Sequence, residues 1–314
     1  MTEQVALFGP AGPELRVVED LVRKIVAKDP PEVAAPMTAL LEAGGKRIRP
    51  ALVLLSAMCG NYDSGHTLSA AMAVEVTHAA TLIHDDVIDR SPTRRGRPTV
   101  AATLGDEPAI VVGDYYFAKA YEMAAWTNTP EVVAVLAQAV MEICAGEVRQ
   151  QSIRYRYSTG VDEYMRRIEA KTAALLAACC DIGALLGELD KEPRAALREY
   201  GRELGLAFQI ADDVLDYTST EGEVGKPIGH DIREGFATLP LMLASIDIED
   251  DRRLTEDEAR NVVEAVLNSD GPQRALEQAR AHAKKALEHL NKLPRTEAVD
   301  ALAALADYVV SRKL

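Results

Sequence analysis

The sequence predicts an all-α protein built as a helical bundle, and three observations carry this prediction. Apolar residues recur with helical spacing along most of the chain, whereas the alternation typical of strands is nearly absent. Only 5% of the residues are aromatic, while Ala, Leu and Glu, which favour helices, are abundant. With 314 residues, of which 48% are hydrophobic, the chain can bury a large core.

The predicted helices are separated by stretches that contain Pro, Gly or Asn. Examples are Gly60-Asn61-Tyr62-Asp63, Asn128-Thr129-Pro130 and Ser269-Asp270-Gly271-Pro272. In chain order, we expect helices at residues 14–28, 31–43, 47–59, 67–89, 107–126, 130–153, 161–188, 192–217, 236–248, 255–268, 272–292 and 296–312.

Some helices are central and others peripheral in this prediction. The segments 67–89 and 161–188 are apolar around much of their circumference, which is typical of helices in the middle of a bundle. The segment from about 249 to 300 is more charged, and we expect it to cover the outside. Because no linker is long enough to separate domains, we expect a single domain over residues 1–314.

Composition excludes several classes of partner. The formal charge of −14 and pI near 5.0 argue against nucleic acid and against an anionic membrane surface. An anionic substrate is still compatible, because bound metal ions invert the local charge of an acidic site. The four cysteines lack CxxC spacing, there is no signal-like N-terminus, and no run approaches the ~20 apolar residues of a membrane span. We therefore expect a soluble cytoplasmic protein without a membrane span.

Two copies of one acidic motif are the strongest functional signal. Asp85-Asp86-Val87-Ile88-Asp89 and Asp212-Asp213-Val214-Leu215-Asp216 each follow an apolar run. On a helix, positions i and i+4 lie on one face, so each motif presents clustered carboxylates. Carboxylate oxygens presented one or two at a time suit Mg²⁺, which keeps several waters and bridges to phosphates. The pair of motifs predicts a binding site that holds a diphosphate through several magnesium ions.

A single DDxxD motif on a solvated helix face would have a simpler interpretation as surface charge. Here, however, the surroundings repeat together with the motif. Val87, Ile88, Val214 and Leu215 give each copy an apolar side that solvated charge does not need. We therefore interpret both copies as parts of a site.

Basic phrases near these motifs favour a phosphate ligand. Gly44-Gly45-Lys46-Arg47-Ile48-Arg49-Pro50 places three cations at an expected helix start, which also favours anions. Arg94-Arg95-Gly96 follows the first motif, and Lys226 lies in a glycine-punctuated loop after the second. Lys171-Thr172 falls inside an apolar helix, where a lysine needs a partner. Each of these basic residues alone would be interpreted as an ordinary surface or core cation. Together they predict two sites that each clamp a diphosphate.

Two histidines lie on the helix that ends at Asp85. An interior histidine such as His78 or His84 is more often a hydrogen-bonded core residue than a ligand. Glu75 and His78 also form a Glu-x-x-His pair, which is typical of di-iron bundles. Those bundles need a second such pair, and the chain has none. We therefore interpret His78 as a residue that donates a hydrogen bond to a phosphate group.

Taken in order along nearly the whole chain, these phrases resemble the trans-isoprenyl (polyprenyl) diphosphate synthase family of the medium- or long-chain type. The resemblance rests on GGKRIRP at 44–50, THAATLIHDDVIDRSPTRRGRPT at 77–99, GEVRQ at 146–150, KTAALL at 171–176, and FQIADDVLDY with GKPIGHDIREGFATLP up to 240. It implies an isoprenoid-synthase helical bundle around a central apolar pocket with two facing DDxxD motifs, usually as a homodimer.

The resemblance also implies a role for each matching residue. The six aspartates Asp85, Asp86, Asp89, Asp212, Asp213 and Asp216 would hold Mg²⁺, three ions in all, on an allylic diphosphate, with Asp85, Asp89 and Asp212 as the main direct ligands. The isopentenyl diphosphate pocket would comprise Lys46, Arg49, His78 and Arg95. Contacts to the allylic substrate would come from Arg94, Lys171, Thr172, Gln209 and Lys226, with Lys171 also counted as catalytic. A basic tail at Arg312 and Lys313 would close over the site.

One departure concerns the phrase before TLP, where family members often carry a lysine. This chain has Gly235-Phe236-Ala237 instead, so Phe236 removes one candidate cation from the allylic clamp. Arg233 is the candidate to compensate.

Small residues predict a long product. The growing chain should run along the helix that ends at Asp85, and residues four and five positions earlier lie about 6–7.5 Å deeper. Short-chain members commonly have an aromatic floor there, whereas this chain has Ala80 and Thr81, preceded by Val76 and Thr77. With Tyr115, Tyr116 and Phe117 as a deeper floor, we expect a product of about C30–C45, with the C20 geranylgeranyl product as the alternative.

Three other functions compete with this prediction. A class I terpene cyclase shares the fold and the first motif, but it does not need GGKRIRP or a second DDxxD. A non-catalytic partner subunit of a heteromeric synthase tends to lose its acidic motifs, and this chain has both. A helical scaffold would have no reason to duplicate DDVID.

Overall fold

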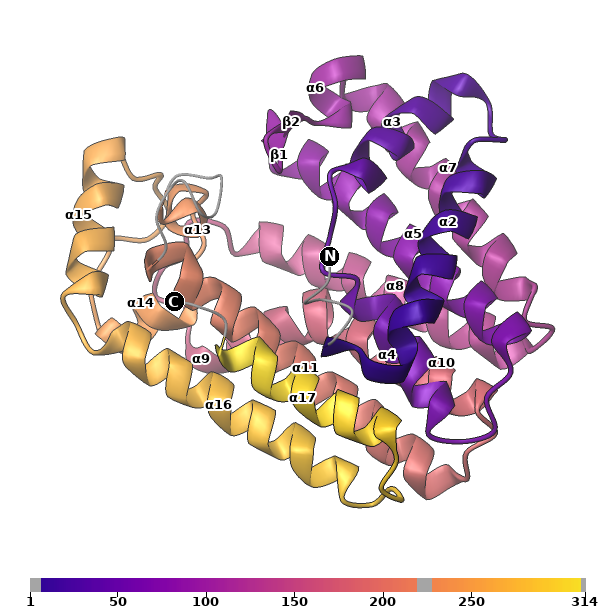
Figure 1. Cartoon of the computed structure of the whole chain (residues 1–314). Coiled ribbons are helices and arrows are strands. Elements are labelled where there is room, and N and C mark those ends of the chain that lie inside the picture. The colour runs from indigo at the N-terminus through magenta and orange to yellow at the C-terminus, as the bar shows by residue number, and fades with distance from the viewer. Residues whose placement is uncertain (1–6, 219–227, 312–314) are drawn as a thin grey trace. The chain divides into compact units, whose positions relative to one another are not determined.

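Helices form almost all of the regular structure in the computed structural model, which describes residues 7–218 and 228–311 (Figure 1). In chain order, the described helices are η1 (Gly9–Ala11), α2 (Gly12–Val26), α3 (Pro31–Glu42), α4 (Ile48–Met58), α5 (Ser64–Ile88), α6 (Val100–Leu104), α7 (Asp106–Ala125), α8 (Pro130–Ser152), α9 (Val161–Ile168), η2 (Glu169–Ala173), α10 (Ala174–Leu186), α11 (Lys191–Thr218), α13 (His230–Arg233), α14 (Leu239–Ala244), α15 (Glu256–Leu267), α16 (Gly271–Leu290) and α17 (Glu297–Ser311). The strands in these ranges are β1 (Thr93–Arg94) and β2 (Arg97–Pro98), an antiparallel pair. The all-α prediction is confirmed.

The structure divides into two compact units. Unit 1 comprises Met1–Gln138, Ala178–Arg198 and Leu293–Leu302, and unit 2 comprises Ala139–Ala177, Glu199–Lys292 and Ala303–Leu314. The boundary falls inside the helices α8, α10, α11 and α17. Whether the two units act as one domain over residues 1–314 stays a prediction.

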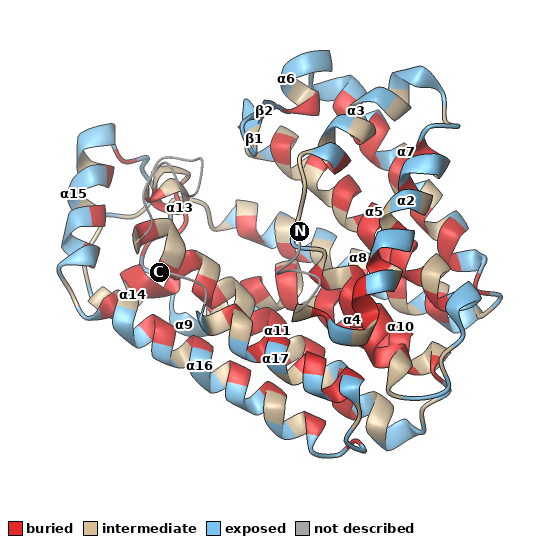
Figure 2. Cartoon of the chain, viewed as in Figure 1, coloured by how far each residue is buried: buried red, intermediate tan, exposed pale blue. Residues whose placement is uncertain are grey.

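The core of unit 1 is centred on α5, which packs against α7 and α4 (Figure 1). Asp63 begins this helix by accepting a hydrogen bond from the Gly65 amide at 2.8 Å. The residues from 70 to 77 are all buried, and many of them are alanines that allow close packing. Figure 2 shows the same burial along α4. The expectation that residues 67–89 form a central helix is confirmed.

Unit 2 has a core to which the last turns of α11 contribute. Leu206, Ile210 and Val214 of α11 pack with Tyr164 and Ile168 of α9. Ala275 and Ala279 of α16 belong to the same cluster, and α14 packs against α16. The apolar face of α16 therefore supports the helix that carries the second acidic motif.

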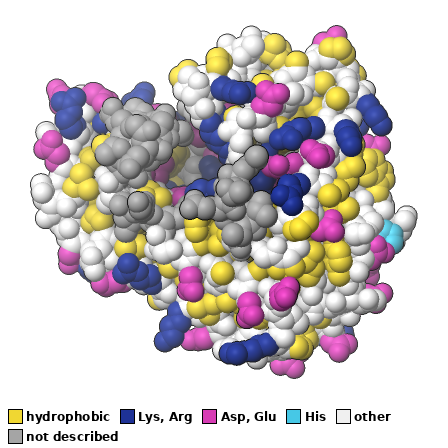
Figure 3. Space-filling model, viewed as in Figure 1, with side chains coloured by type: hydrophobic (Ala, Val, Ile, Leu, Met, Phe, Trp, Pro, Cys, Tyr) yellow, Lys and Arg dark blue, Asp and Glu magenta, His cyan; other side chains and the backbone are white. Residues whose placement is uncertain are grey.

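The face of the molecule that Figure 3 shows is mixed in charge. In Figure 3, Lys and Arg side chains are interspersed with Asp and Glu side chains over the visible face. None of the helices within residues 7–218 and 228–311 combines the length and apolar character that crossing a membrane requires.

Two predicted helices differ from the structure. The segment 161–188 is interrupted by η2, a π-helical turn between α9 and α10. The segment 236–248 is helical only over Leu239–Ala244, since Pro240 lies in its first turn and Ser245 adopts a left-handed conformation with φ 54° that ends it. The short helices α6 and α13 and the β1–β2 hairpin were not predicted, because such short elements lack a periodic signal.

Gly183 of α10 packs against α4 at a point where a side chain does not fit. A Cβ atom there would lie 2.3 Å from the Val53 carbonyl oxygen and 2.7 Å from the Ser56 Cβ. We expect Gly183→Ala to lower the free energy of unfolding by about 1–3 kcal/mol through overpacking, as measured by denaturant titration.

Gly160→Ala is the matched control for this prediction, because nothing lies within 4 Å of a Cβ atom at Gly160. It should lower the free energy of unfolding by no more than about 1 kcal/mol, the cost of alanine at an N-cap position. Equal losses in both variants would contradict the packing argument.

Candidate active site

The first acidic motif lies at the C-terminal end of α5, in unit 1. Asp85 and Asp86 belong to the last turn, and Asp89 is the C-cap residue. Asp85 and Asp89 are partly exposed and one helical turn apart, whereas Asp86 is buried at 3% exposure. The motif therefore offers two accessible carboxylates and one that is turned into the protein.

Asp86 is held by Arg94, which β1 carries. The Arg94 Nε lies 2.9 and 3.0 Å from the two carboxylate oxygens, and its Nη2 lies 2.8 Å from Oδ1. Charge-assisted pairs of this kind are among the stronger hydrogen bonds in proteins. The β1–β2 hairpin thus fixes the middle carboxylate of the motif.

His84 anchors the same end of α5 to α7. Its Nε2 lies 3.0 Å from the Ile110 carbonyl oxygen and 3.7 Å from Asp114, and its ring is 5.5 Å from that of Phe117. A Cβ atom on Gly113 would lie 2.1 Å from the His84 Nε2, so this contact requires glycine on α7. His84 is therefore a packing residue in unit 1.

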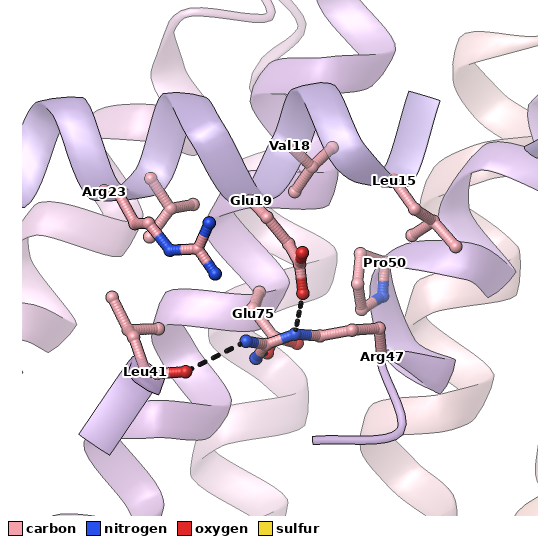
Figure 4. Close-up of a pocket in the computed structure, with 9 residues that line it drawn as sticks. Leu15, Val18, Glu19, Arg23, Leu41, Arg47, Pro50 and Glu75 are labelled. Atoms are coloured by element: carbon pink, nitrogen blue, oxygen red, sulfur yellow. Dashed lines mark hydrogen bonds and ion pairs between the residues drawn. The ribbon is translucent and has the colours of Figure 1, made fainter. Parts of the chain in front are cut away.

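Arg47, in the GGKRIRP phrase, is committed to two carboxylates. It precedes α4 in a left-handed conformation, and its Nε donates to Glu19 at 2.6 Å. Its other nitrogens donate to Glu75 and, at 3.2 Å, to the Leu41 carbonyl oxygen (Figure 4). Burial lowers the pKa of Arg47, but Glu75 and Glu19 outweigh burial and raise it. This network borders a pocket whose other walls include Leu15, Val18 and Pro50.

The other cations of unit 1 surround His78. Desolvation, followed by the positive charges of Arg49, Arg95, Arg94 and Arg47, lowers the pKa of His78 well below its usual value. Arg95 lies near Arg47, since a Cβ atom on Gly45 would be 3.4 Å from an Nη1 of each arginine. Burial and the neighbouring arginines also lower the pKa of Arg95. His78 is therefore neutral beside a concentration of positive charge that suits an anion.

The second acidic motif lies in the last turns of α11, in unit 2. Asp213 is buried at 3% exposure and accepts hydrogen bonds from the Tyr164 hydroxyl and the Gln209 Nε2, both at 2.7 Å. Asp216 accepts from the backbone amides of His230 and Asp231, at 3.1 and 3.2 Å, at the start of α13. Asp212 is partly exposed. As in the first motif, the middle carboxylate is held by protein groups.

Lys171 and Thr172 both lie on the π-helical turn η2. The Lys171 Nζ lies 2.9 Å from the Glu147 carboxylate of α8, and Thr172 donates to the Gln209 Oε1 at 2.6 Å. Because Gln209 in turn donates to Asp213, η2 is connected to the second acidic motif. Turns of this type occur frequently at functional sites.

Two glycines make room for this turn in unit 2. A Cβ atom on Gly146 would lie 2.6 Å from that of Ala170, and one on Gly205 would lie 2.5 Å from the Cα of Ala173. The close approach of α8 and α11 to η2 therefore depends on residues without side chains. It fixes Lys171 and Thr172 beside Glu147 and Gln209.

The donor set suits magnesium better than a metal enclosed by protein. Within the described parts of the chain, no group of three or more His, Cys, Asp or Glu side chains could hold a metal ion. Mg²⁺ is usually held by one or two carboxylates, together with water and substrate phosphate oxygens. The partly exposed carboxylates Asp85, Asp89 and Asp212 fit that mode of binding.

Each unit thus brings together part of the predicted site. Unit 1 contains Lys46, Arg49, His78, Asp85, Asp86, Asp89, Arg94 and Arg95, and unit 2 contains Lys171, Thr172, Gln209, Asp212, Asp213 and Asp216. Lys226, Arg312 and Lys313 lie outside the described residues. That the two motifs face one another across a central pocket stays a prediction.

Sequence reasoning assigned no such role to several residues that organise the site. Glu19, Glu75 and Glu147 neutralise Arg47 or Lys171, and Tyr164 and Asp231 lie beside the second motif. A signal existed for Glu75 and Glu147, because each interrupts the apolar pattern of a helix. No sequence signal marked Glu19 or Tyr164, since their partners are distant along the chain.

Comparisons with known proteins point to one family. The family model for polyprenyl synthetase matches residues 30–269. Heptaprenyl diphosphate synthase component 2 of Bacillus subtilis is 37% identical over 96% of this chain and 88% of its own length. A crystal structure of polyprenyl synthase from Caulobacter crescentus, complexed with calcium and isoprenyl diphosphate, superimposes with a TM-score of 0.93 at 36% identity over 100% of this chain and 98% of that one. A decaprenyl diphosphate synthase from Rhodobacter capsulatus gives a TM-score of 0.88 at 33% identity, covering 96% and 97%.

The second acidic motif predicts how stability depends on pH when metal is absent. Burial, followed by repulsion from Asp231, raises the pKa of Asp213 to about 7 and that of Asp216 to about 8. Between the ordinary carboxyl value of about 4 and these values, the folded state binds more protons than the unfolded state. The free energy of unfolding should therefore fall as pH rises through this window.

Thermal unfolding in a chelator, at about pH 5.5 and about pH 8, measures this dependence. We expect the difference in Tm between the two pH values to shrink in Asp213→Asn, because the buried amide does not titrate. The exposed Asp307→Asn is the control and should keep the wild-type difference. An unchanged pH dependence in Asp213→Asn would contradict the assignment.

Proposed function

The chain belongs to the polyprenyl synthetase family and is a trans-prenyl diphosphate synthase, and we propose that it joins isopentenyl diphosphate head-to-tail to an allylic diphosphate with the help of Mg²⁺. One observation carries the proposal. Each copy of the duplicated acidic motif ends a helix, and in each copy protein groups hold the middle aspartate while an outer one is partly exposed. This arrangement is suited to binding metal together with a diphosphate.

We assign different tasks to the six aspartates. Asp85, Asp89 and Asp212 would contact Mg²⁺ directly, with three ions shared between the protein and the allylic diphosphate. Asp86, Asp213 and Asp216 would support the metal site from fixed positions, since Arg94, Tyr164 and the start of α13 restrain them. When bound, the metal neutralises charge on the departing diphosphate.

Fixed cations would complete the allylic clamp. Lys171 is restrained by Glu147, and Thr172 and Gln209 form a hydrogen-bonded pair beside Asp213. Arg94 and Lys226 are the other proposed contacts. Lys171 would stabilise the charge that develops on the leaving oxygen, because preorganised cations need no rearrangement during reaction.

Isopentenyl diphosphate would bind to the cations of unit 1. Lys46, Arg49 and Arg95 would contact its phosphates, and neutral His78 would donate one hydrogen bond to them. Arg47 has a different task in this proposal, because Glu19 and Glu75 occupy its guanidinium. It fixes the loop that carries Lys46 and leads to Arg49 at the start of α4.

The chemistry follows from these tasks. Departure of the diphosphate leaves an allylic cation, which an apolar surrounding must protect from water. The isopentenyl double bond attacks this cation, and a proton is lost to the released diphosphate. No side chain is required as a nucleophile.

We propose a product of about C30–C45, with the C20 product as the alternative. Ala80 is buried at 0% exposure on α5, and Thr81 donates to the His78 carbonyl oxygen of its own helix. Tyr116 of α7 is also buried, and its hydroxyl donates to the Val33 carbonyl oxygen at 3.1 Å. A tyrosine held in this way is a candidate floor beyond the small residues.

The assembly and location are further parts of the proposal. Exposed apolar side chains on α7 (Ile110 and Val111) favour a homodimer interface on this helix. The name component 2 of the Bacillus subtilis relative favours a second possibility, in which the partner is a different chain. We propose that the units act as one domain, because the family model covers parts of both, and that the protein works in the cytoplasm, where its free cysteines stay reduced.

Asp85→Asn tests the metal assignment. Because it removes a direct ligand, we expect kcat to fall at least about 100-fold and the Mg²⁺ concentration for half-maximal rate to rise. Initial rates with labelled isopentenyl diphosphate, measured over a Mg²⁺ titration, give both values. The control Asp307→Asn removes an exposed carboxylate from α17 and should leave both unchanged. A wild-type Mg²⁺ response in Asp85→Asn would contradict the assignment.

Product analysis by mass spectrometry tests the chain-length proposal. With isopentenyl diphosphate, Mg²⁺ and separate dimethylallyl, geranyl, farnesyl or geranylgeranyl starters, we expect a ladder that ends at about C30–C45. Ala80→Phe should shorten the product by placing an aromatic ring in the path. A wild-type product of C15 or C20 would keep the enzyme but contradict the role given to Ala80 and Thr81. Absence of elongation with every starter would favour the cyclase or the partner-subunit alternative.

A further inference from the structure

Phe236 lies between two arginines in unit 2, at the position where the family resemblance leads us to expect a lysine. The side chain is buried, with 8% exposure. The guanidinium carbon of Arg154 lies 5.6 Å from its ring centroid, and that of Arg167 lies 5.8 Å away. Cations within about 6 Å of an aromatic ring are attracted to it, so both arginines are held by the same ring.

Both arginines also hold the backbone on either side of Phe236. Arg154 Nε donates to the Glu234 carbonyl oxygen at 2.7 Å, and Arg167 Nη2 donates to the Ala237 carbonyl oxygen at 2.6 Å. We call Arg154, Phe236 and Arg167 the arginine clamp. It fixes the segment that joins α13 to α14.

Gly235 makes this arrangement possible. It has φ +88°, and a Cβ atom there would lie 2.3 Å from the Tyr155 ring. The Tyr155 amide donates to its carbonyl oxygen at 2.8 Å. The turn therefore places Phe236 against Arg154 through backbone geometry that favours glycine.

Two paths connect the clamp to the second acidic motif. Arg167 also lies 5.4 Å from the ring centroid of Tyr164, whose hydroxyl donates to Asp213 at 2.7 Å. The Phe236 amide donates to the Asp231 carbonyl oxygen at 2.9 Å, and the Asp231 amide donates to Asp216 at 3.2 Å. Chains of contacts thus connect Phe236 to both aspartates that protein groups restrain in this motif.

We propose that Phe236 is a positioning residue for the second acidic motif, acting through Arg167 and Tyr164 on Asp213 and through Asp231 on Asp216. This inference rests on the proposed role of that motif in binding Mg²⁺ and the allylic diphosphate. Phe236 then has a function of its own, and its presence is more than the absence of a lysine. A lysine at this position would place a third positive charge between two guanidinium groups in a buried site, where repulsion is strong.

The compensation expected from Arg233 has no support in the contacts of that residue. Its Nε donates to the Ile228 carbonyl oxygen at 3.1 Å, and its guanidinium pairs with Glu256. Arg154 is likewise paired with Glu234. In place of a lysine, the chain therefore has an aromatic ring that supports Arg154 and Arg167, which already bind other protein groups.

The test measures steady-state rates of Phe236→Tyr, Phe236→Leu and Phe236→Lys in the full-length chain, well below their melting temperatures. For Phe236→Leu, we expect about a tenfold rise in the Mg²⁺ concentration for half-maximal rate and in KM for the allylic diphosphate. KM for isopentenyl diphosphate should stay unchanged, because its proposed contacts lie in unit 1. Phe236→Lys should be affected more strongly than Phe236→Leu, and Phe236→Tyr, which keeps the ring, should remain within about twofold of the wild type.

Phe8→Leu is the matched control, because Phe8 is a buried phenylalanine of unit 1. It should lower Tm without changing the Mg²⁺ response. If Phe236→Leu lowers Tm but keeps the wild-type Mg²⁺ response and allylic KM, Phe236 is merely structural and the inference is wrong. Improved allylic KM in Phe236→Lys would overturn it as well. A wild-type chain that elongates no starter would instead contradict the proposed function.

Discussion

Carboxylates of like charge gathered at the C-terminal end of a helix are the constraint on which both units depend. The first motif ends α5 and the second lies in the last turns of α11, where the helix dipole already contributes negative charge. Neither cluster would be tolerated without compensation. Unit 1 supplies Arg94, and unit 2 supplies the Tyr164 hydroxyl, the Gln209 amide and the backbone at the start of α13. Asp85, Asp89 and Asp212 are partly exposed, and we propose that they contact Mg²⁺ directly.

The basic part of the site needs negative charge to compensate its clustered cations. Burial, followed by the positive charge of the neighbouring arginines, keeps His78 neutral and lowers the pKa of Arg95. Glu19 and Glu75 relieve part of the repulsion by pairing with Arg47. A diphosphate would relieve the rest. Unit 1 therefore contains an acidic and a basic cluster and unit 2 contains the second acidic cluster. Protein groups hold each cluster in place, and the proposed substrates and metal ions complete the charge balance.

Much of this could be predicted from the sequence, for identifiable reasons. The long helices have strong periodicity, so their positions were predicted to within a few residues, and the duplicated DDxxD made the acidic site visible. The π-helical turn at Lys171 was not predictable, because it depends on Gly146 and Gly205 of other helices. The partners of Arg47, Asp213 and Phe236 come from distant positions, and such contacts leave no periodic trace. In the sequence, Phe236 indicated only the loss of an expected lysine. The positions of Arg154 and Arg167 were needed to find what its ring contacts.

A crystal structure with Mg²⁺ and a non-hydrolysable allylic diphosphate analogue would test the division of tasks among the aspartates most directly. Our account predicts Mg²⁺ about 2.0–2.1 Å from oxygens of Asp85, Asp89 and Asp212, with the diphosphate bridging the ions. Asp86 should still pair with Arg94, and Asp213 with Tyr164. Metal bound directly to Asp86 or Asp213, with those pairs broken, would contradict it.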